Sequence, residues 1–356
     1  MACRRHRYRQ RGVAVVTALL LTTLAVTIVA SLFWQQQVQV RSIENQRLQL
    51  QKQWILRGAL DWARLILREN ARLSNYDSLD QPWAVPLLDT RLDQYVENNR
   101  ADTESSDATL SGQMVDAQSL YNLTNLAPNG QIVEKEVKVF ARLLNSQRLN
   151  PSLAQDTAAM VAASVPRRPP PATGGQGSEQ NIDPLTGLPR ANASPNTNPN
   201  AGAAGNQGTP TVTVSSQRMM PMTQVEDLLA IPGFTPEAVE KLRNLVIFLP
   251  QGGTSLNINT APVEVLAAVI DNISTSDAAV IVATRTTASF RSKETIANQL
   301  PGIPTVGSNN LDVYSNYFLV NGRVKLNRAA LQIQALMKRV GRGPSAKTEL
   351  VWIREN

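Results

Sequence analysis

The longest apolar run of the chain extends from Val13 to Trp34, and its only polar members are threonines and a serine. As a helix rising about 1.5 Å per residue it would be about 33 Å long, enough to cross the roughly 30 Å hydrocarbon core of a membrane. Arginines precede the run and glutamines follow it. The positive-inside rule therefore predicts a transmembrane helix over 13–34 with its amino terminus in the cytoplasm.

Three kinds of segment compete at this position. A secretory signal peptide has a shorter apolar region, of about 7 to 15 residues, and a small-x-small cleavage site, for which residues 29–31 are a poor substitute. A plain signal anchor fits both the length and the charge. The third interpretation is a short basic leader that ends in a glycine. It depends on Gly12, which lies directly before the apolar run.

The pattern changes after Trp34. Residues 35–70 contain no proline and repeat apolar residues at steps of three and four, which predicts that the same helix continues. A short coiled coil is the alternative, but the polar Arg47 interrupts a strict seam. We therefore expect the upper half of the helix to pack on its own globular domain.

Apolar and polar residues alternate in two later regions, as in half-buried strands. Two short strands are predicted within 109–126, and a three-stranded meander at the carboxyl end, with Asn321-Gly322 as a tight turn. We expect the meander to pack on the amino-terminal helix. The acidic segment 81–107 is expected to be irregular surface.

The middle of the chain carries helix signals. Thr235 is a predicted cap residue before Pro236, the first residue of a helix. Residues 166–210 are rich in Pro, Gly, Asn and Ser, which predicts a disordered surface loop; a linker between independent domains is the alternative. Short helices joined by tight turns predict a helical bundle. The other predicted helices span 134–149, 151–163, 260–270, 275–284 and 292–300.

Composition excludes several kinds of chemistry. The only cysteine is Cys3 and the only histidine is His6, both before the apolar run. The body of the chain therefore has no thiol or imidazole for a nucleophile, a triad or a zinc site, and we predict that the protein is not an enzyme. Oxygen ligands for calcium remain available, but the aspartates of 81–107 lack the spacing of a calcium loop, and solvated surface is favoured. They are Asp89, Asp93, Asp102 and Asp107.

The formal net charge of +7 is concentrated in the leader. Without its five arginines, 30 basic residues face 28 acidic ones, a balance of +2. An acidic partner such as nucleic acid is therefore not indicated for the rest of the chain.

The sequence from 257 to 303 resembles helix-hairpin-helix modules, many of which bind DNA phosphates at helix amino termini. Here the hairpin IDNISTS has no glycine and carries Asp271 where a phosphate would lie, and the hairpin IPGFTP keeps only Gly233. Contact with protein is therefore favoured over nucleic acid. A membrane-anchored helix-hairpin-helix protein for DNA binding or uptake is the alternative function.

The basic leader, Gly12 and the apolar run together resemble the leader of type IV prepilins and type II secretion pseudopilins. The resemblance implies that a prepilin peptidase cuts between Gly12 and Val13, after the leader charges Arg9 and Arg11, and that the new amino terminus is methylated. Most members carry glutamate at mature position five, where this chain has Thr17. That glutamate is thought to pair with the amino terminus of the subunit ahead, so its absence argues either against the family or for a subunit at the tip.

The order of elements resembles the minor pseudopilin K family of type II secretion. The texts YNLTNL (121–126) and SLNINTAPVEVLAA (255–268) and the missing glutamate at Thr17 carry the resemblance. It implies an α+β pseudopilin fold: a leader (1–12), a transmembrane helix (13–34) with its periplasmic continuation (35–70), and an antiparallel core (71–126 and 305–356). An all-α insertion of two SAM-like modules is expected over 127–304.

The same resemblance implies a place in the cell and a set of partners. The chain would sit in the inner membrane of a Gram-negative bacterium, with its bulk in the periplasm, at the tip of a pseudopilus that exports folded proteins across the outer membrane. Expected partners are the minor pseudopilins I and J, then H and the major pseudopilin G, and the prepilin peptidase. No nucleic acid or small-molecule substrate is expected. Some members carry calcium, for which no ligands are assigned here.

Overall fold

The computed structural model describes residues 11–91, 108–165, 220–299, 310–326 and 329–355. The predicted loop 166–210 lies outside them. The chain divides into two compact units. Unit 1 comprises Met1–Ser119, Ser255–Pro262 and Ser276–Asn356, and unit 2 comprises Leu120–Thr254 and Val263–Thr275.

The predicted amino-terminal helix is a single element, α1 (Arg11–Leu73), of 63 residues. Its threonine hydroxyls do not interrupt it, because those of Thr22, Thr23 and Thr27 each donate to the carbonyl three residues earlier at 2.8–2.9 Å. Among the described residues, one helix is long and apolar enough to cross a membrane, and it covers Ala14–Leu73. No described residue of its most apolar part is buried.

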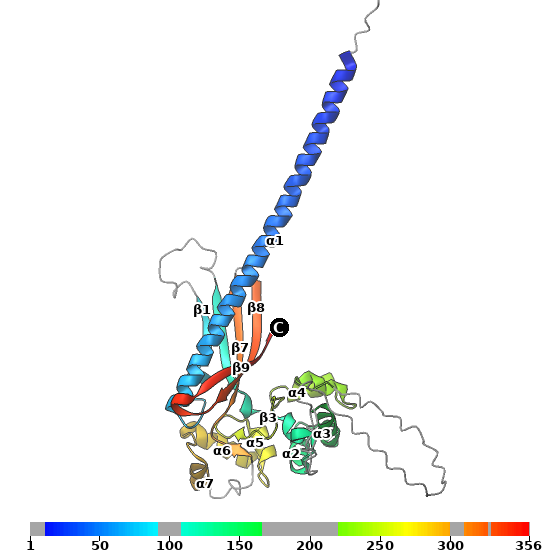
Figure 1. Cartoon of the computed structure of the whole chain (residues 1–356). Helices are drawn as coiled ribbons and strands as arrows, with labels where there is room; N and C mark the ends of the chain where they lie inside the picture. The colour runs from blue at the N-terminus through cyan, green and yellow to red at the C-terminus, as the bar shows by residue number, and fades with distance from the viewer. Residues whose placement is uncertain (1–10, 92–107, 166–219, 300–309, 327–328, 356) are drawn as a thin grey trace, which may run out of the picture. The chain divides into compact units, whose positions relative to one another are not determined.

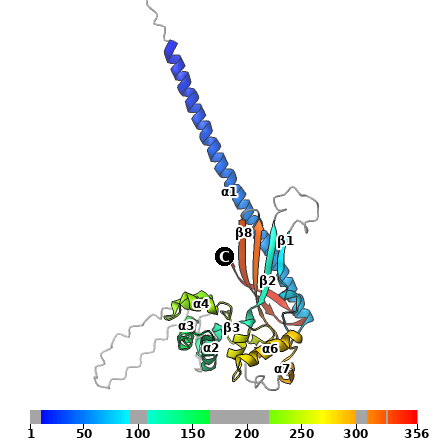
Figure 2. The same ribbon diagram turned by 180° about the vertical axis from the view of Figure 1, so that it is seen from behind.

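Unit 1 contains a five-stranded antiparallel sheet in the order β1-β2-β7-β8-β9. Its last three strands are the predicted meander. In Figures 1 and 2 the second half of α1 lies along one face of the sheet. The strands are β1 (Leu87–Arg91), β2 (Thr109–Asp116), β7 (Tyr317–Leu326), β8 (Ala329–Val340) and β9 (Lys347–Glu355).

The core of unit 1 joins the helix to the sheet, as predicted. Four residues at helical spacing on α1 face alternate residues of β7 and β8, so two sequence periods meet in one apolar layer. Trp83, just before β1, packs edge to face on Phe318 with ring centroids 5.1 Å apart. The helix contributes Leu56, Leu60, Ala63 and Leu67, and the strands contribute Phe318, Val320, Val324, Ile333, Ala335 and Met337.

The predicted turn at Asn321-Gly322 is wrong, because both residues lie inside β7, where Gly322 pairs with Gly112 and with Ile333. A Cβ on Gly322 would lie 3.3 Å from Ile333 Cγ1 and 3.6 Å from Leu56 Cδ2. The glycine thus serves the close approach of helix and sheet, and not a reversal of the chain.

The segment 81–107 was also expected to be irregular throughout, and this is wrong in part. It contains a 3-10 turn, η1 (Pro82–Ala84), and strand β1, which pairs with β2 through a bulge between Leu87 and Thr90. The strand exists because of that pairing, and its own short sequence carries no period-2 signal.

The remainder of unit 1 consists of short elements around a two-stranded parallel pair, β5 (Leu256–Asn257) with β6 (Leu311–Asp312). The helices α6 (Thr275–Thr287) and α7 (Lys293–Gln299) and the 3-10 turns η4 (Ala117–Ser119) and η8 (Gly343–Ser345) complete it. Residues 255–262 and 276–299 group with unit 1, although they lie within the predicted insertion, 127–304, whose bounds stay a prediction.

Unit 2 is mainly helical and contains the predicted helices as α2 (Glu134–Ser146), α3 (Leu153–Ser164), α4 (Pro236–Leu242) and α5 (Val263–Val269). The predicted cap is confirmed, since Thr235 Oγ1 accepts from the N–H of Ala238 at 3.2 Å. Helix α2 packs on both α3 and α5. The other elements are β3 (Tyr121–Asn122), paired with β4 (Val246–Ile247), and the 3-10 turns η5 (Leu123–Leu126), η6 (Pro128–Gly130) and η7 (Val225–Ala230).

Candidate functional sites

The amino-terminal residues predicted to be functional lie in the first turns of α1. The helix begins at Arg11, so Gly12 and Val13 are helical, and Thr17 donates its hydroxyl to the carbonyl three residues earlier at 3.1 Å. Arg9 lies outside the described residues. Cleavage after Gly12 would require the first turn to unwind, which glycine makes easier because it is a poor helix former. The roles of these residues stay predictions.

A buried polar cluster surrounds Asp116, the last residue of β2. Its Oδ2 accepts hydrogen bonds from Asn257 Nδ2 at 2.8 Å and from the hydroxyls of Thr260 and Ser315 at 2.6 Å each. Its Oδ1 accepts from the N–H of Gln118 at 2.8 Å. Burial raises the pKa of Asp116 to about 6, because desolvation disfavours the charged carboxylate more than these hydrogen bonds favour it.

Asp77 and Arg339 form an ion pair beside Asp116, and both side chains are fully buried. The carboxylate of Asp77 also accepts from the N–H of Ser315 at 2.8 Å. The Arg339 guanidinium lies 4.1 Å from the ring centroid of Tyr314, a cation–π contact. Burial raises the pKa of Asp77, although the charge of Arg339 acts in the opposite direction.

We call this cluster the Asp116 junction. Each member is buried and bonded to another member, and the bonded residues are separated by as many as 262 positions. The cluster therefore joins distant segments of unit 1 through buried hydrogen bonds and one ion pair. The junction comprises Asp77, Asp116, Asn257, Thr260, Ser315 and Arg339.

The segment 255–268, which carries the family resemblance, supplies two members of the junction. Thr260 was predicted to open a helix, but α5 begins at Val263, because the Thr260 hydroxyl donates to Asp116 and does not cap the helix. Asn259 bonds both backbone groups of Phe290, at 2.8 and 2.9 Å. These partners could not be predicted from the sequence, since they are distant in the chain.

A second polar cluster, the Asn122 junction, holds unit 2 together with neutral groups. Asn122 Oδ1 accepts from the N–H of Leu249 at 3.0 Å, and its Nδ2 donates to Thr254 Oγ1 at 2.9 Å. Asn125 bonds both backbone groups of Thr254, at 2.9 and 3.1 Å. The text YNLTNL thus supplies the two amides that join η5 to the segment after β4.

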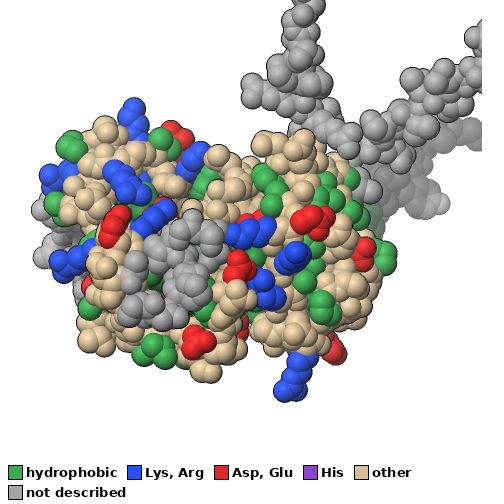
Figure 3. All heavy atoms as spheres, turned by 90° about the horizontal axis from the view of Figure 1, so that it is seen from below, with side chains coloured by type: hydrophobic (Ala, Val, Ile, Leu, Met, Phe, Trp, Pro, Cys, Tyr) green, Lys and Arg blue, Asp and Glu red, His purple; other side chains and the backbone are tan. Residues whose placement is uncertain are grey.

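The hairpin residues considered for phosphate binding have partners within unit 2. Asp271 accepts from Arg142 at 2.8 Å, and Arg142 Nε donates to the carbonyl of Ala268, also at 2.8 Å. Gly233 has a φ of +103°, and a Cβ there would lie 2.7 Å from Leu153 Cδ2. Over the described residues of the face in Figure 3, basic and acidic side chains are interspersed and do not gather by sign. These features favour structural roles over nucleic-acid contact.

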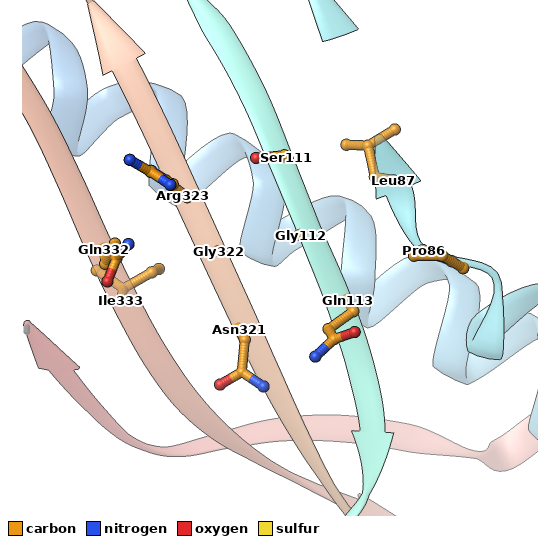
Figure 4. A pocket seen from close by; sticks show the side chains of 10 residues that line it. All are labelled: Pro86, Leu87, Ser111, Gly112, Gln113, Asn321, Gly322, Arg323, Gln332 and Ile333. Atoms are coloured by element: carbon orange, nitrogen blue, oxygen red, sulfur yellow. The ribbon is translucent and has the colours of Figure 1, made fainter. Parts of the chain in front are cut away.

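A shallow hollow of about 470 Å³ lies on the face of the sheet opposite α1. In Figure 4 the side chains of Gln113, Asn321, Arg323 and Gln332 come from β2, β7 and β8 around the glycine pair. Among the described residues that line it there is no carboxylate, thiol or imidazole.

The structure leaves the calcium expectation untested. Among the described residues, no three side chains of His, Cys, Asp or Glu lie close enough to hold a metal ion. Of the four aspartates considered, Asp89 lies in β1 and the other three lie outside the described residues.

Comparison with known proteins gives consistent matches. Two family models, both described as type II secretion system protein K, match residues 119–251 and 256–314. A type II secretion system protein K from Pseudomonas aeruginosa is 26% identical over 353 residues, covering 97% of this chain and 92% of its own. One chain in the crystal structure of the GspK-GspI-GspJ complex of the enterotoxigenic Escherichia coli type 2 secretion system matches with a TM-score of 0.53 at 20% identity. That match covers 89% of this chain and 99% of the other, and supports the mixed helix and sheet fold with its long amino-terminal helix.

Proposed function

Since the chain belongs to the protein K family of the type II secretion system, we propose that it is a non-enzymatic minor pseudopilin at the tip of the pseudopilus. There it would take part in the export of folded proteins across the outer membrane. The observation that carries the proposal is α1, a single helix with two parts. Its first part is apolar and exposed, and its second part packs on an antiparallel sheet and forms a hydrophobic core with it. Such a helix anchors and positions a domain.

We place the protein in the inner membrane as a single-pass protein, with its amino terminus in the cytoplasm and its bulk in the periplasm. The exposed apolar part of α1 and the arginines before it support this orientation. The prepilin peptidase would cut between Gly12 and Val13, and the helix would stay on the mature protein.

Our proposed partners are the minor pseudopilins I and J, followed by H and the major pseudopilin G. The likeness to a chain from a GspK-GspI-GspJ complex supports the first two. We propose no nucleic-acid partner and no small-molecule substrate; the alternative of a DNA-uptake protein gains no support from the comparisons.

Thr17 supports the tip position. In a filament where a glutamate meets the amino terminus of the subunit ahead, the first subunit would hold an unpaired carboxylate in apolar surroundings, which costs several kcal/mol. Threonine avoids that cost, because its hydroxyl bonds within its own helix. Thr17→Glu should therefore bring no gain in secretion.

For the predicted insertion we retain two SAM-like modules as the proposal. The short helices of unit 2 and the cap at Thr235 are typical of such modules. Calcium binding also remains a proposal, with no ligands assigned.

Co-purification tests the proposed function. The full-length chain would be expressed with pseudopilins I and J, extracted from membranes in detergent and isolated by an affinity tag. We expect both partners in the eluate, and a mature amino terminus at Val13 by mass spectrometry. An intact Met1, together with the absence of I and J, would contradict the proposal.

A further inference from the structure

A pocket of about 610 Å³ opens in unit 1 beside the end of α6. Its walls come from the loop after α1, from the end of α6 with the loop behind it, and from α7. Its volume lies within the range of about 300–1,000 Å³ that is typical of ligand sites. We call it the α6 pocket; its wall includes Tyr76, Leu79, Asp80, Arg285, Ser289 and Arg291.

Arg285 is held at this wall by one nitrogen of its guanidinium. Its Nη1 donates to the carbonyls of Ile258 and Ala261, at 2.6 Å each. Its Nε and Nη2 donate to no described group, and neither atom is buried, so a ligand can reach them. The fold therefore positions this side chain and leaves two of its nitrogens available as donors.

The charge of Arg285 is not offset within the described part of the chain. Arg142 and Arg339, which are also shielded from solvent, each pair with an aspartate. Arg285 is half-buried, and its hydrogen bonds go only to the two carbonyls. Burial lowers the pKa of Arg285 to about 10, as expected for a cation that is desolvated without a carboxylate beside it. An anion in the pocket would offset this cost.

Arg291 supplies a second guanidinium to the same wall. It lies 6.0 Å from the ring centroid of Tyr76, a cation–π contact between two residues of the pocket, and forms no ion pair with a described residue. The loop between the two arginines is fixed, because Asn259 bonds both backbone groups of the buried Phe290. Two guanidinium groups on a preformed wall suit a planar oxyanion.

The net charge of the α6 pocket favours an anion with one charge. Two arginines and one carboxylate, that of Asp80, are among its lining residues, which gives +1. Asp80 Oδ1 accepts from Ser289 Oγ at 3.3 Å and also from the hydroxyl of Ser78. A phosphate monoester carries a charge of about −1.5 to −2 at neutral pH, so Asp80 would repel it more strongly than it repels a carboxylate.

The other lining groups indicate that the carboxylate belongs to a larger ligand. Leu79 is 58% exposed at the wall and offers an apolar surface. The hydroxyls of Thr287 and Ser289 donate within the chain, and their oxygens can still accept from N–H groups. Apolar side chains, N–H groups and a carboxylate occur together in a peptide.

We propose that the α6 pocket binds a carboxylate of a peptide segment, with the carboxylate on Arg285 and Arg291 and an apolar side chain of the segment on Leu79. The carboxylate of a chain end and that of an acidic side chain share this chemistry. The pocket lies in one compact unit of the chain, so the inference does not depend on the proposed function.

Peptide binding to the full-length chain in detergent tests the site. The probe is a tetrapeptide of alanine and leucine with a neutral fluorophore at its amino end, and fluorescence anisotropy measures its affinity. Three forms are compared: a free carboxyl end, an amidated end, and an amidated end with one aspartate. We expect the first or the third to bind at least tenfold more tightly than the second, and the tighter of the two identifies the source. Equal affinities, or no binding of any form, would overturn the proposal.

Substitutions separate the α6 pocket from general charge attraction. Arg291→Gln should weaken binding of the carboxylate peptide at least fivefold, whereas Arg323→Gln, at another exposed arginine of unit 1, should change it less than twofold. Equal losses would show binding by surface charge alone and would overturn the proposal. Because Arg291 is exposed and makes no hydrogen bond, its replacement should leave the melting temperature unchanged.

Competition tests the charge of the ligand. Acetate should displace the bound peptide at a lower concentration than inorganic phosphate does, at pH 8 and equal ionic strength, where phosphate carries about two charges. Asp80→Asn should reduce that difference, because it removes the carboxylate that repels phosphate. Stronger displacement by phosphate in the unsubstituted chain would contradict the assignment to a carboxylate.

Discussion

The two polar junctions stabilise their units with different kinds of interaction, neutral hydrogen bonds in one and buried charges in the other. In the Asn122 junction all hydrogen bonds join neutral amides, hydroxyls and backbone groups. The Asp116 junction buries two carboxylates and one guanidinium. A neutral network is costly only where a bond is missing, whereas a charged network also carries the desolvation of its ions. Unit 1 should therefore be more sensitive than unit 2 to loss of one partner and to pH.

Removal of the buried cation should have the largest effect. Arg339→Met leaves the Asp77 carboxylate without its counter-ion, and breaking a buried pair in this way costs about 3–5 kcal/mol. The free energy of opening, measured by hydrogen exchange of the full-length chain, should fall in β7 and β8 and stay unchanged in α2.

A matched double variant tests the cause. Asp77→Asn together with Arg339→Met removes both charges and keeps a polar group for the N–H of Ser315. It should recover part of the lost stability. No recovery would mean that packing of Arg339 on the rings of Tyr314 and Phe318, and not its charge, stabilises the junction.

The dependence of stability on pH should give the second-largest difference between the two units. The pKa of Asp116 is about 6 in the folded chain, against an ordinary 3.8, so the folded state binds this proton more tightly than the unfolded chain does. Stability of unit 1 should be highest below about pH 4 and fall by up to about 3 kcal/mol as pH rises to about 6. The raised pKa of Asp77 acts with the same sign.

Asp116→Asn provides the control for this response. The amide keeps one acceptor oxygen and cannot ionise, so most of the slope between pH 4 and 6 should disappear from the peptides of unit 1. Peptides around the Asn122 junction, which contains no carboxylate, should show little slope in either protein. An unchanged slope in the variant would assign the response to another group.

The sequence predicted the parts of the fold that depend on local periodicity. Helix α1 and the strands β7, β8 and β9 follow repeats of three to four and of two residues, and the cap at Thr235 follows from its immediate neighbours. Strand β1 was missed and Asn321-Gly322 was misassigned, because pairing and packing decide both. The Asp116 junction was not predictable, since Asp116 meets Asn257 and Ser315 across 141 and 199 positions.

The last prediction has the smallest expected effect on stability. It is also the sharpest test of the comparison, because the same substitution, threonine to valine, is made in both junctions. Thr260 donates its hydroxyl to the Asp116 carboxylate at 2.6 Å, whereas the Thr254 hydroxyl accepts from the neutral amide of Asn122 at 2.9 Å. Valine keeps the shape and removes the bond. Loss of a hydrogen bond to a charged group costs about 1.5–3 kcal/mol, and to a neutral group about 0.5–1.5 kcal/mol.

Thr260→Val should therefore destabilise the peptides of unit 1 by about 1 kcal/mol more than Thr254→Val destabilises those of unit 2. The difference should shrink as the pH falls below about 6, where Asp116 takes up its proton and no longer accepts as a charged group. Hydrogen exchange of both variants at pH 4 and pH 7, corrected for intrinsic exchange rates, measures it. Equal losses at both pH values would show that the buried carboxylate behaves as a neutral acceptor, and the contrast between the two junctions would then be one of position in the chain and not of charge.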